Sequence, residues 1–169
     1  MRATTILHNA ATRPAEAAQR LRASLSSEVL NAHLGDHDNS VAWLLWHTGR
    51  EIDVQTADLA GTSEAWSHEG YAQLTGIGAV GDGLGLGHTT GEAREITSDQ
   101  GDALVDYVAA ATDALLAYIS TLTDADLDEV IDENWDPPVT RGVRLVSIID
   151  DAAQHVGQAA YAVGALSQR

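Results

Sequence analysis

Apolar residues recur at three- and four-residue intervals in four long stretches of the chain, and this spacing predicts amphipathic helices. The predicted helices cover about residues 12–32, 40–61, 98–122 and 144–166. Pro14, in a first turn, favours a start of the first helix near Thr12. Ser40 or its neighbour Asn39 suits the N-terminal cap of the second helix, and Gly61 suits its left-handed end.

The connections between the predicted helices differ from one another. Residues 62–97 are rich in glycine and show little periodicity, apart from a short helix predicted within residues 63–74. A connection of this length inside a domain is uncommon and is usually functional or mobile. Residues 123–132 predict a capped turn or a short helix, and Pro137 and Pro138 exclude helix directly after it. Four long helices with one long crossover predict an all-α four-helix bundle.

The composition narrows the classes of partner. The length suits one domain, residues 1–169. Twenty-five acidic residues against nine basic ones give a net charge of −16, which disfavours binding to nucleic acid or to an anionic membrane surface. The sequence shows no signal peptide and no run of about 18 apolar residues, so we expect a soluble cytoplasmic protein. Cysteine is absent, which excludes a protein thiolate and a cysteine-bound zinc.

Three familiar motifs match only in part. Gly76, Gly78 and Gly81 fit the dinucleotide-binding glycine pattern, but no strand precedes them in the predicted structure. The acidic runs that begin at Asp36 and Asp124 resemble calcium loops, yet both lack the required glycine and the bidentate glutamate. We interpret the two runs as solvated acidic segments that cap helices.

One group of residues has the spacing of a metal site. His47 lies on or beside the apolar stripe of the second helix. Asp151 and His155 are four residues apart, which places both on one face of the fourth helix; Asp150 projects about 100° away from that face. One histidine and an Asp-x-x-x-His pair could converge on a divalent cation such as zinc, nickel or iron. The alternative is a hydrogen-bonded core histidine beside an ordinary helix ion pair.

Other residues are candidates for binding roles, each with a structural alternative. Gln158 follows His155 by one turn and could orient it, and with Arg50 it is the expected contact for a bound cofactor. Arg50 could instead form surface ion pairs, and the same two roles are open to Arg141 and Arg144. Three tryptophans, Trp43, Trp46 and Trp135, could line the pocket or pack in the core. His88 could belong to a lid or be exposed, and Tyr161 could lie in the core or near a dimer surface.

The stretches 39–53, 86–92 and 134–166 together resemble the DinB-like superfamily. The closest resemblance is to its small single-domain branch, related to the N-terminal domain of mycothiol-dependent maleylpyruvate isomerase. The resemblance implies an up-down-down-up bundle, often dimeric, with a zinc or nickel site. The ligands it implies here are His47, Asp151 and His155, with Asp151 standing where the family more often has histidine or glutamate.

Members of this superfamily with known activities are thiol-dependent S-transferases or isomerases that use mycothiol, bacillithiol or glutathione. The resemblance therefore implies a metal-dependent enzyme that acts on a small molecule and uses mycothiol as cosubstrate. It also implies that the enzyme is a homodimer. A metal-bound thiol has a lowered pKa, and the absence of cysteine fits a thiol supplied from outside. Two alternatives remain open: a non-catalytic dimer that binds a metal or small ligand, and a metal-free interaction protein.

Overall fold

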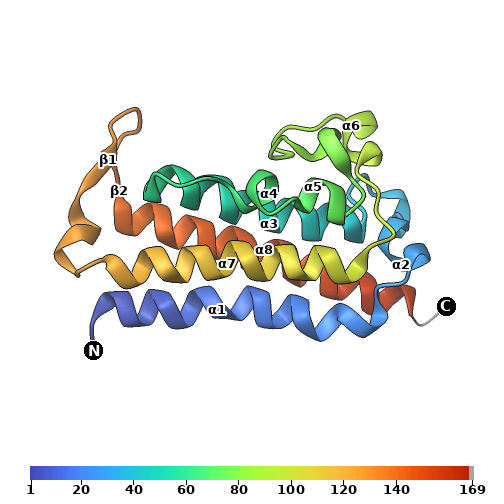
Figure 1. The fold of residues 1–169 in the computed structure, drawn as a ribbon, viewed down its shortest axis with the longest axis horizontal. Coiled ribbons are helices and arrows are strands. Elements are labelled where there is room, and N and C mark those ends of the chain that lie inside the picture. Colours follow the sequence, from blue (N-terminus) through green and yellow to red (C-terminus); the bar gives the residue numbers. More distant parts are fainter. Residues whose placement is uncertain (168–169) are drawn as a thin grey trace.

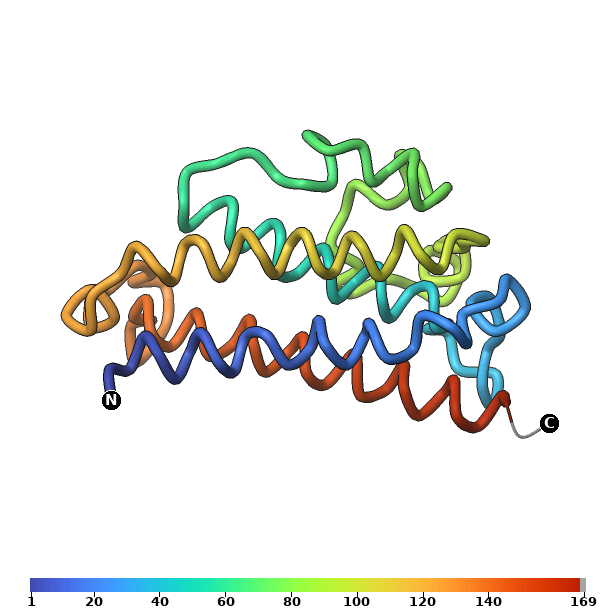
Figure 2. The backbone as a smooth tube through the Cα atoms, turned by 60° about the horizontal axis from the view of Figure 1, so that its bottom comes forward, coloured from blue at the N-terminus to red at the C-terminus, as the bar shows by residue number. Residues whose placement is uncertain are grey.

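Four long helices run side by side in the computed structural model, which describes residues 1–167 (Figure 1). They are α1 (Ala3–Leu21), α3 (Val41–Ala60), α7 (Gly101–Thr121) and α8 (Arg141–Leu166). Helices α1 and α8 run in one direction and α3 and α7 in the other (Figures 1 and 2). Both α1 and α3 pack against α7 and α8. The expected all-α, up-down-down-up bundle is confirmed, and residues 168–169 of the expected domain lie outside the described residues.

Short elements fill the connections. Their bounds are η1 (Arg22–Ser24), α2 (Ser27–Asn31), η2 (Leu34–Asp36), α4 (Ala65–His68), α5 (Tyr71–Leu74), η3 (Gly78–Gly81), α6 (Thr90–Glu95), η4 (Ala125–Asp128), β1 (Val130–Asp132) and β2 (Val139–Thr140). The two strands form an antiparallel hairpin that pairs Val130 with Thr140 and Asp132 with Val139. The crossover from α3 to α7 therefore holds short helical turns, and the connection from α7 to α8 holds the hairpin.

The first helix begins and ends earlier than the sequence predicts. Helix α1 starts at Ala3 instead of Thr12, with Pro14 buried inside it. The carboxylate of Asp124 accepts hydrogen bonds from the backbone N–H groups of Ala3 (3.1 Å) and Thr4 (3.2 Å), so a residue distant in sequence caps this helix. The helix ends at Leu21, eleven residues before position 32, because the chain turns there and Ser26 caps the separate helix α2.

The other helix ends follow local signals more closely. Ser40 caps α3 by accepting a hydrogen bond from Trp43 N–H, and Gly61 ends it with a φ of 65°, both as predicted. Helix α7 starts at Gly101 instead of Ser98. The Ser98 hydroxyl donates to the Thr75 carbonyl and so fixes the crossover. Helix α8 starts three residues before the predicted position, where the side chain of the preceding threonine caps it.

The buried core divides into two clusters along the bundle. The larger lies beneath the crossover and contains Trp46, Trp66 and Tyr107. The smaller lies at the opposite end and contains Leu115 and Ile148 with their neighbours. Within residues 1–167, α7 is the one helix long and apolar enough to cross a membrane, but half of that apolar stretch is buried inside the bundle. It therefore has the character of a core helix.

A glycine sets the distance between α3 and α7. A Cβ atom built on Gly49 would lie 2.4 Å from the ring of Tyr107, closer than carbon atoms can approach. The absence of a side chain thus lets the tyrosine ring lie against the backbone of α3. This close packing brings the Tyr107 hydroxyl to Asp53, whose carboxylate accepts its hydrogen bond at 2.9 Å.

Candidate metal centre

The structure brings His47 of α3 together with Asp151 and His155 of α8. One ligand atom from each lies within 4.8 Å of the other two, so the group could hold a metal ion. His47 Nε2 is 4.0 Å from Asp151 Oδ2, and His155 Nε2 is 3.4 Å from Asp151 Oδ1. Two ligands of one zinc ion lie at most about 4.4 Å apart, because each bond is about 2.0–2.2 Å long. Small side-chain rotations are enough to close the group on an ion.

Local structure explains this placement. Asp151 and His155 are one turn apart on the side of α8 that faces α3. The ring of His47 stacks on Trp43, one turn earlier in α3, with centroids 4.5 Å apart and planes at 21°. The rings of His47 and His155 meet edge to face at 4.5 Å. Aromatic packing thus holds both imidazoles against the carboxylate.

A buried oxygen in this group lacks a partner. Asp151 Oδ2 is shielded from solvent and accepts no hydrogen bond from any described residue, although it faces His47 Nε2. A buried polar atom without a partner is costly, whereas a bound cation would satisfy it. Two imidazole nitrogens and a carboxylate oxygen are also the donor set that zinc and nickel accept. The residues present therefore fit a divalent metal.

Hydrogen bonds select the imidazole nitrogens that face the site. His47 Nδ1 bonds to the carbonyl oxygen of Leu84, and since a carbonyl only accepts, Nδ1 carries the proton. The lone pair of His47 is then on Nε2, toward Asp151. His155 Nδ1 is 3.4 Å from Gln158 Oε1, the position expected for an orienting group. Both histidines thus have a partner on the nitrogen remote from the site, as metal-binding histidines usually do.

Burial and charge set the protonation of the group. Burial lowers the pKa of His47, which favours the neutral ring that binds metals. The hydrogen bond to Asp151 raises the pKa of His155. Burial on its own would raise the pKa of Asp151, but the hydrogen bond and charge of His155 and the charge of His47 outweigh it, and the net shift is downward. Near neutral pH the group therefore offers a carboxylate and a neutral His47.

The group opens onto a pocket of about 380 Å³. Apart from the three ligands, the pocket is lined by Asn39, Trp43, Glu51, Gly85, Leu86, Gly87 and His88. If the three residues bind a zinc ion, the open pocket would leave a coordination position for water or another small molecule. The glycine-rich end of the crossover forms one wall of this pocket, so the connection is part of the site.

Of two further pocket residues, Glu51 is not among the candidates from the sequence, whereas His88 is. Glu51 lies one turn after His47 and half-buried, and burial, reinforced by the charge of Asp151, raises its pKa. Its four-residue spacing from His47 is the signal that could have identified it. His88 accepts a hydrogen bond at Nδ1 from Trp43 Nε1 (3.3 Å) and stacks on Trp46. His88 is thus held against the pocket wall by aromatic side chains.

Arg50 lies elsewhere than its expected cofactor-binding role requires. Its side chain is 2% exposed and is absent from the lining of the metal pocket. The guanidinium donates to the carbonyls of Asp82 and Gly83, to Glu64 and to Tyr107. These bonds engage its donors within the protein, so the placement does not support direct contact with a cofactor. Gln158, in contrast, lies beside His155 as described above.

The aromatic and arginine candidates differ in burial and in position. Trp46 is fully buried in the core, whereas Trp43 lines the metal pocket. Trp135 is 64% exposed between the hairpin strands, so the predicted pocket or core position is wrong. Tyr161 is 74% exposed, which excludes its predicted core position. The two arginines at the start of α8, Arg141 and Arg144, form ion pairs with acidic residues of the hairpin segment.

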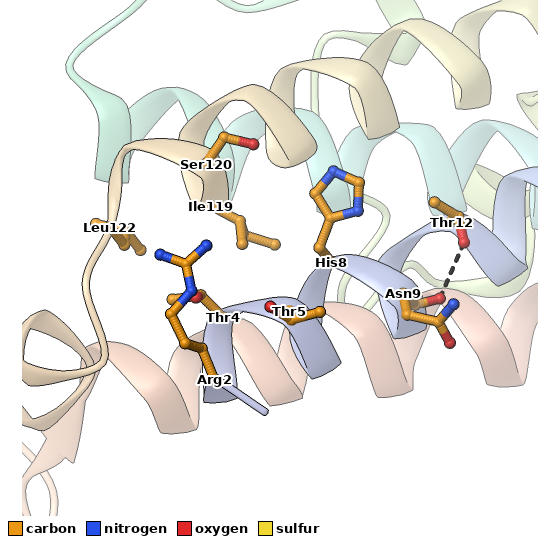
Figure 3. Close-up of a pocket in the computed structure, with 9 residues that line it drawn as sticks. All are labelled: Arg2, Thr4, Thr5, His8, Asn9, Thr12, Ile119, Ser120 and Leu122. Carbon is orange, nitrogen blue, oxygen red and sulfur yellow. Dashed lines mark hydrogen bonds between the residues drawn. The ribbon is translucent and has the colours of Figure 1, made fainter.

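A second hollow lies between α1 and the end of α7 (Figure 3). It is lined by Arg2, Thr4, Thr5, His8, Asn9, Thr12, Ile119, Ser120 and Leu122. None of these nine lining residues is acidic. This hollow therefore differs from the site around His47, where two histidines and a carboxylate converge.

Comparisons with known proteins agree with this architecture. The sequence model of the DinB superfamily matches residues 11–159. The chain also resembles the crystal structure of a conserved protein from Enterococcus faecalis, with 33% identity, a TM-score of 0.85 and 96% of each chain covered. No curated protein matches the sequence. The narrower relation to maleylpyruvate isomerase stays a prediction.

Proposed function

The chain belongs to the DinB superfamily, and on this basis we propose that it is a divalent-metal-dependent transferase or isomerase that uses a low-molecular-weight thiol. The observation that carries the proposal is the group of His47, Asp151 and His155 at the base of an open pocket. We further propose zinc or nickel as the metal and mycothiol as the thiol. A homodimer in the cytoplasm is part of the same proposal and rests on the family resemblance and the composition.

The chemistry follows from the donor set and the composition. When bound, a divalent cation lowers the pKa of a coordinated thiol, so that a thiolate forms at neutral pH and can attack an electrophile. The chain contains no cysteine, so the sulfur must come from a cosubstrate. Asp151 would offset part of the charge of the cation, and His47 and His155 would bind it through their Nε2 atoms. Glu51, on the same side of α3, is our candidate acceptor for the proton of the thiol.

A neighbouring groove suggests the character of the substrate. A groove of about 530 Å³ shares Asn39 with the metal pocket and is lined mainly by apolar atoms. Its walls include Leu34, Leu44 and Ala162, with Gln158 close to the ligand His155. The net charge of −16 disfavours an anionic ligand. We therefore propose an uncharged substrate with an apolar part that extends from the metal into this groove.

Metal content tests the first half of the proposal. Protein grown with zinc and nickel and purified without chelator is analysed for bound elements, and about one ion per chain is expected. His47→Ala and His155→Ala each remove a ligand and should lose the ion. His8→Ala is the matched control, because His8 lies in the other hollow (Figure 3). Wild-type protein free of metal, or both variants with a full complement of metal, contradicts the proposal.

Turnover tests the second half. The metal-loaded protein is incubated with mycothiol, bacillithiol or glutathione and a panel of uncharged electrophiles, and both the loss of free thiol (transfer) and the conversion of the electrophile at constant thiol (isomerisation) are measured. We expect transfer or isomerisation with at least one thiol, abolished by His155→Ala and unchanged by His8→Ala. Bound metal without turnover across the panel would instead favour the non-catalytic binding protein.

A further inference from the structure

Four consecutive carbonyl groups of the crossover accept hydrogen bonds from one face of α3. Trp46 Nε1 donates to Gly81 O at 3.1 Å. Arg50 spans the next two carbonyls, with Nη2 donating to Asp82 O at 2.9 Å and Nε to Gly83 O at 3.0 Å. His47 Nδ1 donates to the fourth, Leu84 O. The carbonyl that fixes the metal-ligand histidine is therefore the direct neighbour of the carbonyls held by Arg50.

We propose that Arg50 is a positioning residue for the metal centre. By holding the carbonyls of Asp82 and Gly83, it fixes the carbonyl of Leu84, and through it the tautomer and orientation of His47. Arg50 thus acts on the site without touching a ligand of the metal. The effect on metal affinity rests on the proposed function; the effect on the tautomer of His47 does not.

The surroundings of Arg50 suit this role. The side chain is 2% exposed, and Nη1 donates to Glu64 Oε2 at 2.8 Å and to the Tyr107 hydroxyl at 3.3 Å. The guanidinium also lies over the ring of Trp66, 5.5 Å from its centroid. A planar guanidinium held on several sides can bridge two successive carbonyls in fixed geometry, which the single ammonium of lysine cannot reproduce. The fork is thus a rigid link between α3 and the crossover.

Few other contacts fix the segment: the Asp82 carboxylate accepts a hydrogen bond from Trp66 Nε1 (2.9 Å), and the Asp82 N–H donates to Ala79 O. Within residues 1–167, the N–H groups of Gly83 and Leu84 donate to no backbone carbonyl. Gly85 follows with a φ of 85°, so the chain reverses just beyond the carbonyl that His47 uses. The carbonyls of residues 81–84 are therefore held by side-chain donors from α3. Without Arg50, two of these four carbonyl contacts are lost.

Loss of the Leu84 contact would change what His47 offers to a metal. A neutral imidazole carries one proton, on Nδ1 or on Nε2, and the acceptor at Nδ1 decides which. With Leu84 O displaced, His47 can place its proton on Nε2, and an N–H group cannot bind a cation. Hydrogen-bond partners of metal-ligand residues typically contribute 10- to 100-fold in affinity (order of magnitude).

The test compares Arg50→Gln with wild type in two measurements. In metal-free protein, imidazole ¹⁵N shifts report the tautomer of His47, and we expect one Nδ1–H form in wild type and a mixture in the variant. Competition with a chelator reports Zn²⁺ affinity, which we expect to fall about 10- to 100-fold. If Arg50→Gln is not folded, Arg50→Lys carries the test, with a smaller tautomer mixture and a smaller loss of affinity.

Asp53→Asn is the matched control. Asp53 belongs to the same buried network: it bonds to the N–H groups of Ala65 and Trp66 and lies 3.8 Å from Arg50 Nη1, but it does not touch the carbonyls of residues 81–84. It should lower stability and leave the His47 tautomer unchanged. An unchanged tautomer and Zn²⁺ affinity in the folded Arg50 variant would overturn the proposal. If wild type binds no Zn²⁺, the proposed function fails, while the tautomer measurement still decides this inference.

Discussion

The two long connections of the bundle are held in opposite ways. The crossover between α3 and α7 folds back over these helices, whereas the connection between α7 and α8 turns beyond the end of the bundle (Figure 1). Buried groups of α3 hold the first, among them Asp53 and Arg50, each 2% exposed. Partly exposed ion pairs to Arg141 and Arg144 hold the second. The crossover forms a wall of the metal pocket, and the hairpin does not contribute to it.

The difference shows what a connection needs in order to contribute to a site. A buried hydrogen bond in a low-dielectric environment holds one geometry, because breaking it leaves an unsatisfied group. An exposed ion pair exchanges readily with water and adds little to stability. The crossover can therefore hold Leu84 O against His47. The hairpin has no comparable buried contact to a residue of the metal group within the described chain.

Asp53→Ala should have the largest effect on the crossover. Its carboxylate accepts hydrogen bonds from Ala65 N–H (2.9 Å), Trp66 N–H (2.8 Å) and the Tyr107 hydroxyl (2.9 Å). The carboxylate also pairs with the buried Arg50, 3.8 Å away. Its removal leaves three hydrogen-bond donors and a buried cation without their partner, so we expect the free energy of unfolding to fall by about 3–5 kcal/mol. Urea denaturation followed by circular dichroism measures this.

A substitution in the hairpin is the matched control for Asp53→Ala. Asp132→Ala removes the partner of Arg144, a partly exposed pair with a 3.3 Å separation. We expect the urea midpoint to stay close to that of wild type. If both variants unfold at the same midpoint, the two connections do not differ in the way the structure indicates.

Gly85→Ala should have the next largest effect. This glycine has a φ of 85°, and a Cβ atom would lie 2.8 Å from the ring of Trp46 and 3.0 Å from that of Trp43. We expect a loss of about 2–4 kcal/mol from backbone strain and overpacking together. Zn²⁺ affinity should also fall, because displacement of Trp43 moves the ring on which His47 stacks.

Gly87→Ala separates backbone strain from overpacking. Gly87 has a φ of 74°, but no described atom lies within 4 Å of a Cβ built there. It should lose only the backbone part, about 1–2 kcal/mol, with Zn²⁺ affinity unchanged. Equal losses of affinity in the two variants would mean that backbone strain alone, and not the tryptophan contacts, couples this loop to the metal.

Asp124→Ala tests the second connection through pH. The N–H groups of Ala3 and Thr4 lower the pKa of Asp124 below its ordinary value of 3.8. A carboxyl with a lowered pKa in the folded state contributes stability above its ordinary pKa, and this is lost as the pH falls through the lowered value. We expect a smaller decrease in Tm than for Gly85→Ala. The difference from wild type should be constant above about pH 5 and shrink below 3.8. A difference that persists at pH 2 would show that the cap does not depend on charge.

The features of this fold that depend on residues close together in the sequence could be predicted from it. The caps of α3 at Ser40 and Gly61 are local, so both ends of that helix are predicted correctly. The four-residue spacing of Asp151 and His155 likewise places both beside His47 once α3 and α8 pack together. That packing is implied by the family resemblance and not by the spacing itself.

The missed parts depend on contacts distant in sequence. The cap of α1 comes from Asp124, about 120 positions away, so local signals place the helix start wrongly. The partners of Arg50 are carbonyls more than 30 positions away, and carbonyls have no signature in a sequence. The path of the crossover determines where these carbonyls lie, and the many glycines in this segment allow several paths. The role of Arg50 is therefore visible only in three dimensions.

Trp135→Ser should have the smallest effect and probes both connections at once. Trp135 is 64% exposed in the hairpin, so we expect the free energy of unfolding to change by less than about 0.5 kcal/mol. Zn²⁺ affinity should be unchanged. The other three tryptophans, Trp43, Trp46 and Trp66, are 5%, 0% and 2% exposed. Acrylamide quenching of tryptophan fluorescence should therefore fall sharply in the variant, because the accessible indole is gone.

The residual quenching in Trp135→Ser then reports on the crossover. Trp43 lies in the wall of the metal pocket, and the segment that carries Gly85 and His88 covers it. If that segment stays closed in solution, the variant resists acrylamide as a buried core does. Strong residual quenching would mean that the segment opens and exposes Trp43. The crossover would then be the mobile connection despite its buried hydrogen bonds, and His47 would lose the fixed Leu84 carbonyl on which its orientation depends.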